Sequence, residues 1–132
     1  DSANGYGSTN NKIRRFTNVV DNVGSDITYA DSATLGATFT INTAGVYSVI
    51  YVDNFNPNGN LGLSINSTQL ATDIGAILVA DRLAMSTSGS ANYTVTTGAT
   101  FYATATSVVR AHCGGNPTGV ATRQNFTIAR VA

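Results

Sequence analysis

The chain has 132 residues, of which 42% are hydrophobic, enough to form the packed core of one domain. Seven Lys and Arg residues balance seven Asp residues, so the formal net charge is zero, and charged residues make up only 11% of the chain. This balance argues against a protein that binds nucleic acid or an anionic membrane through charge, and no apolar run is long enough to span a bilayer.

Composition also favours sheet over helix and indicates a covered surface. Glu is absent and Lys12 is the only lysine, while Ala, Thr, Ser, Asn and Gly take their place. Glu and Lys favour helices, whereas Thr, Val, Tyr and Phe favour strands. So few charges protect a lone monomer poorly against association, so we expect burial in an oligomer or a particle shell. The alternative is that Ser, Thr and Asn alone keep a monomer soluble.

The first residues differ from the rest of the chain. Residues 1–11 are small, polar and glycine-bearing, and we expect an extended arm that is either a flexible terminus or a contact with a neighbouring subunit. Residues 12–132 contain neither an internal repeat nor a linker, which predicts a single domain. The one cysteine, Cys113, excludes an intrachain disulfide and favours a protein that assembles in a reducing cytosol.

Two short strands are predicted next. Residues 12–20 predict a strand with Ile13 and Phe16 as apolar anchors, and residues 21–31 contain a second strand between two turns. A basic cluster, typical of a solvated strand edge, lies in the first strand: Lys12, Arg14 and Arg15. Two side chains share one face of the second strand: Ile27 and Tyr29.

The clearest pattern is a pair of strands across residues 37–53. One face of the first strand is apolar: Leu35, Ala37, Phe39 and Ile41. Residues 42–45 supply the turn, in which Gly45 can adopt a positive φ. The second strand carries apolar residues on both faces: Val46, Ile50 and Val52 on one, and Tyr47, Val49 and Tyr51 on the other. This two-sided apolar character is typical of a strand that is buried on both sides.

Four residues of this pair carry a family resemblance: Phe39, Gly45, Tyr47 and Tyr51. At this spacing they resemble the core strand pair of the complement-type globular head, a trimeric jelly roll related to the tumour-necrosis-factor fold. The resemblance implies an all-β jelly-roll β-sandwich of about 8–10 antiparallel strands. It also implies a homotrimer, with Tyr47 and Tyr51 as candidates for the subunit interface. In that fold the last strand, here residues 124–131, is tied into the centre of a sheet.

The middle of the chain alternates strand and turn signals. Residues 54–60 carry Asn-Pro and Asn-Gly and predict a loop. Residues 61–66 predict a strand whose leucine and isoleucine side chains point inward. Residues 70–85 predict one or two strands because Gly75 interrupts their near-helical spacing, and a short helix is the alternative.

Turn signals also divide the C-terminal third. Residues 86–92 predict a loop, and residues 93–105 predict a hairpin that turns at Thr97 and Gly98. Residues 112–119, HCGGNPTG, are the most loop-like stretch of the chain.

Few residues can carry chemistry. His112 is the only histidine, and it adjoins Cys113, whose side chain points to the opposite side in an extended chain. We expect no enzyme because a base and its orienting group are missing, and no cofactor or metal because one chain offers too few ligands. Two alternatives stay open: a metal held by three copies of His112 on a trimer axis, and a calcium site in residues 54–60, whose first donors are amides.

The leading hypothesis is a protein that acts through surface and assembly. The resemblance extends to domains of bacteriophage head fibres, tail fibres and capsid decoration proteins. It implies a homotrimeric virion structural protein that contacts other virion proteins, with a host surface receptor as a further partner and no nucleic acid or membrane partner. The alternative is a cell-surface or secreted module that binds a carbohydrate or protein ligand through its loops. The contact-loop candidates are Phe55, Asn56, Asn58, His112 and Asn116.

Overall fold

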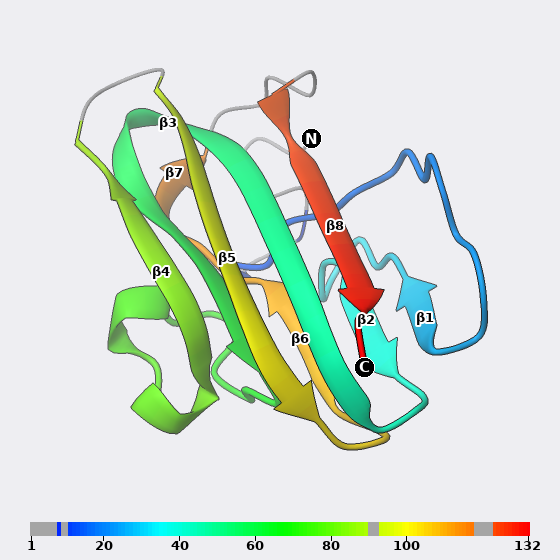
Figure 1. The fold of residues 1–132 in the computed structure, drawn as a ribbon. Coiled ribbons are helices and arrows are strands. Elements are labelled where there is room, and N and C mark those ends of the chain that lie inside the picture. Colours follow the sequence, from blue (N-terminus) through cyan, green and yellow to red (C-terminus); the bar gives the residue numbers. More distant parts are fainter. Residues whose placement is uncertain (1–7, 9–10, 90–92, 118–122) are drawn as a thin grey trace.

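The fold is an antiparallel β-sandwich, shown in Figure 1. The computed structural model describes residues 8, 11–89, 93–117 and 123–132, except for the side chains of residues 56, 57, 116 and 117. The strands are β1 (Ile27–Ala30), β2 (Thr38–Ile41), β3 (Gly45–Ile65), β4 (Arg82–Ser88), β5 (Thr94–Ala103), β6 (Val108–Ala111), β7 (Gly114–Pro117) and β8 (Asn125–Arg130). Two 3₁₀ turns, η1 (Ile74–Ala76) and η2 (Val79–Asp81), precede β4. The all-β prediction is therefore confirmed; in the described part of the chain, no helix has the length and apolar character needed to cross a membrane.

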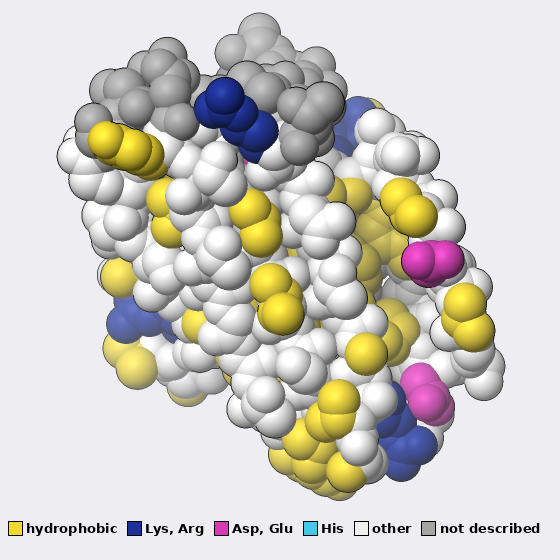
Figure 2. Space-filling view, turned by 45° about the horizontal axis from the view of Figure 1, so that its top comes forward, with side chains coloured by type: hydrophobic (Ala, Val, Ile, Leu, Met, Phe, Trp, Pro, Cys, Tyr) yellow, Lys and Arg dark blue, Asp and Glu magenta, His cyan; other side chains and the backbone are white. Residues whose placement is uncertain are grey.

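The strand β3 takes part in both layers of the sandwich. Residues 45–54 pair with β5 and β8, and residues 55–65 pair with β4, β6 and β7. Figure 1 shows β3 curving over at one end of the molecule between these two halves. A three-stranded sheet, in the order β5–β3–β8, thus faces a larger sheet in the order β1–β2–β6–β3–β4. Figure 2 shows the outer surface of the three-stranded sheet.

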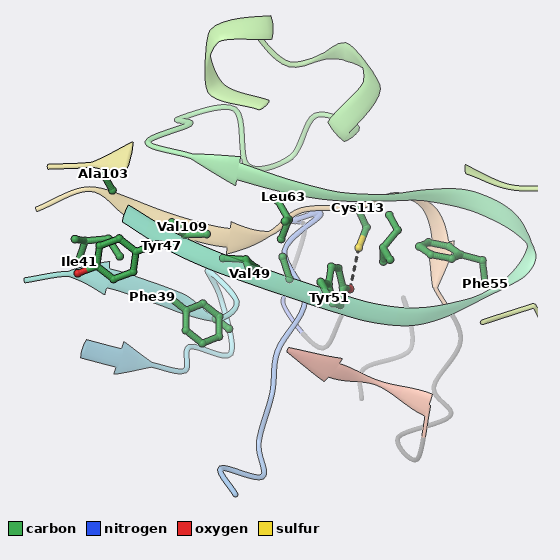
Figure 3. Packing of buried hydrophobic residues seen from close by; sticks show 13 residues of the cluster. Phe39, Ile41, Tyr47, Val49, Tyr51, Phe55, Leu63, Ala103, Val109 and Cys113 are labelled. Carbon is green, nitrogen blue, oxygen red and sulfur yellow. Dashed lines mark hydrogen bonds between the residues drawn. The ribbon is translucent and has the colours of Figure 1, made fainter. Parts of the chain in front are cut away.

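The core lies between the two sheets, as Figure 3 shows. The odd-numbered residues of the first half of β3 point inward because successive side chains of a strand alternate between its faces. They meet apolar side chains from the second half of β3 and from β2 and β6. Full burial of one such side chain stabilises a fold by about 1.5–3 kcal/mol. The fully buried hydrophobic members of this cluster include Ile41, Tyr47, Tyr51, Phe55, Leu61, Leu63 and Val109.

The prediction of a loop at residues 54–60 is wrong. This segment stays in β3, and the pairing with β7 shifts register between Phe55 and Gly59, which marks the bend. Phe55 is fully buried and packs in the core cluster. A β-carbon on Gly59 would lie 2.5 Å from the carbonyl oxygen of Gly114, so glycine is required where the strand folds back. The Asn-Pro and Asn-Gly signals therefore mark a bend between the two sheets rather than a loop.

Several other element boundaries also differ from the prediction. Residues 12–20 form no continuous strand: only Ile13 makes a bridge, to His112. Residues 74–81 form the turns η1 and η2, and β4 extends through Ser88 into the predicted loop. Leu35 is 51% exposed and lies before β2 rather than on its apolar face.

The C-terminal strands correct two further predictions. β5 runs straight through Thr97 and Gly98, so the chain turns only after Ala103, where Thr106 adopts a left-handed φ of 72°. β8 pairs only with β3 among the described strands and forms an edge rather than the centre of its sheet. Residues 112 and 113 are buried, and β7 follows them directly.

Other predictions are confirmed. β1 places Ile27 and Tyr29 on one face, and both pack against the core. Leu61 and Leu63 point inward from β3. Of the predicted arm at residues 1–11, only residues 8 and 11 are described; Ser8 is buried and its hydroxyl donates to the carbonyl of Ile13 at 2.6 Å.

Candidate functional site

The two tyrosines predicted at a subunit interface lie inside the chain. Tyr47 and Tyr51 are both fully buried. The hydroxyl of Tyr47 donates to the carbonyl of Thr43 at 2.5 Å, and Tyr51 points to Cys113 (Figure 3). The interface expectation is corrected: both rings face the opposite sheet of the same chain, so neither offers a surface to a second copy.

The predicted contact-loop residues do not form a shared surface. Phe55 and His112 are fully buried, whereas Asn58 is exposed at the bend of β3. The side chains of Asn56 and Asn116 lie outside the described part of the chain. The expectation of a contact is therefore corrected for Phe55 and His112, because the bend turns Phe55 into the core and the segment of Thr72 covers His112.

His112 is buried on the face of the larger sheet that points away from the core, where the segment that carries Thr72 and η1 covers it. Its Nδ1 lies 3.1 Å from the hydroxyl of Ser64, and its Nε2 lies 2.7 Å from the carbonyl of Thr72. A carbonyl can only accept, so Nε2 carries the proton and Nδ1 accepts from Ser64. Burial is the main cause that lowers the pKa of His112. The side chain is fully buried, so three copies cannot meet around a metal. Among the described residues, no group of three or more metal-binding side chains is placed to hold an ion.

A fully buried ion pair lies at the centre of the sandwich. The Nη2 of Arg14 donates to Oδ1 of Asp53 at 3.0 Å, and Nε of Arg14 lies 3.0 Å from Oδ2. The hydroxyl of Tyr51 donates to Oδ2 of Asp53 at 2.5 Å and lies 3.2 Å from the sulfur of Cys113. The backbone N–H of Asn54 also donates to Asp53, at 2.7 Å. The carboxylate thus receives donors from two side chains and the main chain.

The chemistry of this cluster is that of a structural network. Burial is the main cause that raises the pKa of the Cys113 thiol to about 12 and raises the pKa of Tyr51 well above its ordinary value. Thiolate, the reactive form of cysteine, is therefore not populated near neutral pH. The cluster holds together the N-terminal segment, β3 and the segment before β7, and its four side chains are fully buried.

The predicted basic cluster is divided among three acidic partners. Arg14 is buried against Asp53, so the solvated-edge prediction is wrong for this residue. Two ion pairs lie nearer the surface, at 3.3 and 2.6 Å: Lys12 with Asp73, and Arg15 with Asp31. The N–H of Arg14 donates to the carbonyl of Ala111 at the end of β6, which holds this part of the segment beside the larger sheet.

The outer surface of the three-stranded sheet carries no charged side chain on its outward positions. We call these positions the uncharged face. Figure 2 shows this surface as white with separate yellow side chains, and charged side chains lie near its margins. The register of β5, β3 and β8 places the outward residues side by side. They are Thr94, Thr96, Gly98, Thr100 and Tyr102 of β5, Val46, Ser48, Ile50 and Val52 of β3, and Asn125, Thr127 and Ala129 of β8.

A groove of about 930 Å³ opens between β8 and the segment of residues 15–23. Figure 2 shows it as a hollow at the side of the molecule with hydrophobic side chains inside. Phe39 and Phe126 stack in it with ring centroids 4.1 Å apart, and Phe16 lies 5.5 Å from Phe126. Tyr29 completes the aromatic floor, 5.1 Å from Phe39. The volume lies in the range of small-ligand and peptide sites.

The sequence contained a signal for the uncharged face but none for the groove. The two-sided apolar pattern of β3 indicated that its outward positions would need a cover, whereas the groove forms from four aromatic residues on separate segments. Neither a protein-family model nor a curated protein matches this sequence.

Proposed function

We propose that this chain is a non-enzymatic structural subunit that assembles with copies of itself through the uncharged face. One observation carries this proposal. β3 is apolar on both faces, and within a single chain the inner face is buried whereas the outer face is only partly covered: Val46 and Val52 are half-buried and Ile50, in the middle, is 53% exposed. A strand of this composition is typical of two-sided burial.

The absence of charge supports a second copy of the chain as the partner that covers the uncharged face. Like charges on two copies of a chain repel each other, whereas the twelve outward positions of the uncharged face carry no charge and can lie against another copy. Threonine and small residues dominate the face around Ile50, Val52 and Tyr102. Around a threefold axis this face lies against a different surface of the neighbouring copy, because two equivalent faces packed on each other would close a dimer instead.

The biological setting in this proposal is a virus particle. The resemblance of Phe39, Gly45, Tyr47 and Tyr51 to the trimeric jelly-roll head supports a homotrimer that serves as a capsid decoration, head-fibre or tail-fibre domain of a bacteriophage. The partners in this setting are other virion proteins and, at the tip of a fibre, a host surface receptor. The low share of charged residues supports a surface that is largely covered in the assembly.

The test is the molar mass of the chain in solution, measured by light scattering at micromolar concentration. We expect three times the chain mass for the wild type. Ile50→Asp introduces one charge at the centre of the uncharged face and is expected to return the mass to that of one chain. Val79→Asp is the matched control, because Val79 in η2 is 74% exposed and lies outside the face.

A wild-type monomer at these concentrations would overturn the proposal, as would an Ile50→Asp variant that keeps the wild-type mass. Circular dichroism of both variants checks that the sandwich remains folded. The phage setting has its own test: the wild-type chain is expected to copurify with particles, whereas a chain absent from purified particles contradicts that setting.

A further inference from the structure

The groove lies beside an open strand edge. β8 ends the three-stranded sheet and β1 ends the larger one, and each has only one strand partner among the described residues. Both edges lie on the same side of the sandwich in Figure 1. A strand edge presents a row of backbone donors and acceptors that another strand can pair with.

The register identifies which groups of β8 face the groove. The N–H of Val131 donates to the carbonyl of Val46 at 2.8 Å, and the N–H of Val46 donates to the carbonyl of Ala132 at 2.7 Å, so the N–H of Val131 points to β3. In an antiparallel pair, the backbone N–H and C=O groups of successive residues point alternately towards the partner strand and away from it. The N–H and C=O groups of Asn125, Thr127 and Ala129 therefore point to β3. Those of three intervening residues point into the groove: Phe126, Ile128 and Arg130.

The floor of the groove continues the core of the sandwich. The side chains of Phe126 and Ile128 point inward from β8 and pack against the core cluster. Phe16, Tyr29 and Phe39 extend this apolar surface towards β1. A strand placed beside β8 would set every second side chain over this floor and the others in line with the uncharged face.

The outer wall of the groove limits the size of an occupant. Residues 17–23 form this wall, and it presents Val20 and Val23, which are 80% and 93% exposed. A second folded sheet cannot approach the edge of β8 through this wall, whereas a single extended chain can lie between the wall and the strand. The six residues of β8 match a segment of about 20 Å.

The two arginines at the rim are already paired. Arg15 donates to Asp31, and Nη1 of Arg130 lies 3.8 Å from Oδ2 of Asp26. Asp21 is the remaining charged residue among those that line the groove, so the arginines need no acidic group from an occupant.

We propose that this groove binds an extended, uncharged peptide segment of another polypeptide, about six residues long, by strand addition to β8. Its inward side chains are apolar and lie over Phe126, Ile128 and Phe39. Its outward side chains are small or hydroxyl-bearing and extend the surface of the three-stranded sheet. The site goes beyond self-assembly, because it lies at the edge of the uncharged face and selects a different occupant.

The probe is a synthetic peptide, acetyl-Thr-Val-Thr-Val-Thr-Val-amide, titrated into the full chain and followed by NMR. We expect a dissociation constant below about 100 µM. Amide hydrogen exchange is expected to slow at least about tenfold at Phe126, Ile128 and Arg130. It should stay unchanged at Asn125 and Thr127, whose amides already pair with β3.

Two controls separate strand addition from simple apolar binding. The same peptide with every backbone amide N-methylated keeps its side chains but cannot pair with β8, and it is expected not to bind. The double variant Val20→Asp and Val23→Asp changes the wall and is expected to weaken binding at least about fivefold. The matched variant Leu78→Asp with Val79→Asp changes exposed apolar residues outside the groove and is expected to have no effect.

Three results would overturn the inference: no binding of the probe, equal binding of the N-methylated peptide, or binding without slower exchange at Phe126 and Ile128. Equal binding would identify the groove as a pocket for apolar small molecules instead. The outcome is independent of self-assembly, because the wall variants lie off the uncharged face and should leave the mass measured by light scattering unchanged.

Discussion

At the scale of single residues, the contact between Arg14 and Asp53 joins positions 39 residues apart in the chain. Both side chains are fully buried, and Tyr51 and the N–H of Asn54 also donate to the carboxylate. Burying two charges is expensive, so such a pair contributes more to a unique arrangement than to net stability. We infer that it fixes the N-terminal segment against β3.

The ion pair can be tested by removing one partner. Asp53→Asn leaves Arg14 charged in the core, and we expect the free energy of unfolding to fall by about 3–5 kcal/mol. Asp31→Asn breaks the partly exposed pair with Arg15 and should cost at most about 1 kcal/mol. Urea denaturation measures the free energy of unfolding of both variants. Equal losses in the two variants would show that the buried pair has no special role.

The single histidine gives the protein a defined response to pH. Burial lowers the pKa of His112 below its ordinary value of 6.5, so the folded chain keeps it neutral where the unfolded chain binds a proton. The unfolded state then carries more protons, and the free energy of unfolding falls as the pH drops below 6.5. The slope is at most about 1.4 kcal/mol per pH unit.

Urea denaturation at pH 7.5 and pH 5.5 measures this slope, and His112→Gln is expected to reduce it. Burial raises the pKa of Asp53, which acts in the opposite direction because the folded state then binds the proton more tightly. Both proteins retain Asp53, so the difference between their slopes reports on His112. An unchanged slope in the variant would contradict the neutral, buried histidine.

At the scale of elements, the bend of β3 joins the two sheets. Gly59 lies at this bend, where a β-carbon would approach the ring of Phe55 and the carbonyl of Gly114. We expect Gly59→Ala to lower the free energy of unfolding by about 1–3 kcal/mol, because the backbone must shift in a packed region. Gly89→Ala is the control, since a β-carbon there meets nothing within 4 Å. Similar thermal midpoints for the two variants would contradict the close approach.

The sequence predicted the strands whose pattern is local and missed features that depend on distant partners. The alternation in β1, β2 and β3 follows from burial of one face, so it could be read directly. The bend at residues 54–60 resembles a loop in sequence, and only pairing with β7 makes it part of a strand. The burial of Arg14 could not be predicted, because its partner lies on another strand.

Of the two candidate sites, one follows from a local sequence pattern and the other depends on segments far apart in the chain. The uncharged face follows from alternation along β3 and β5, so its outward positions were largely predictable. The groove needs the neighbouring positions of β8 and residues 15–23, which no local pattern specifies. The sequence makes Tyr47 and Tyr51 candidates for a subunit interface, because aromatic residues are common there. Their alternation with Ser48 and Ile50 shows instead that they belong to the inner face.

At the scale of the whole molecule, the chain presents two different surfaces on neighbouring sides. In our proposal the uncharged face contacts another copy of the chain, whereas the groove holds one extended segment. Assembly through the face leaves the edge of β8 at its margin. The proposed subunit thus joins a particle with one surface and holds a partner chain with the other.

The most direct measurement is the solvent exposure of the Ile50 methyl groups, followed by NMR with a soluble paramagnetic agent at micromolar protein concentration. Within one chain Ile50 is 53% exposed and Val79 is 74% exposed. If sister copies cover the uncharged face, the signals of Ile50 resist relaxation by the agent while those of Val79 are strongly attenuated. Comparable attenuation of Ile50 and Val79 would contradict the account.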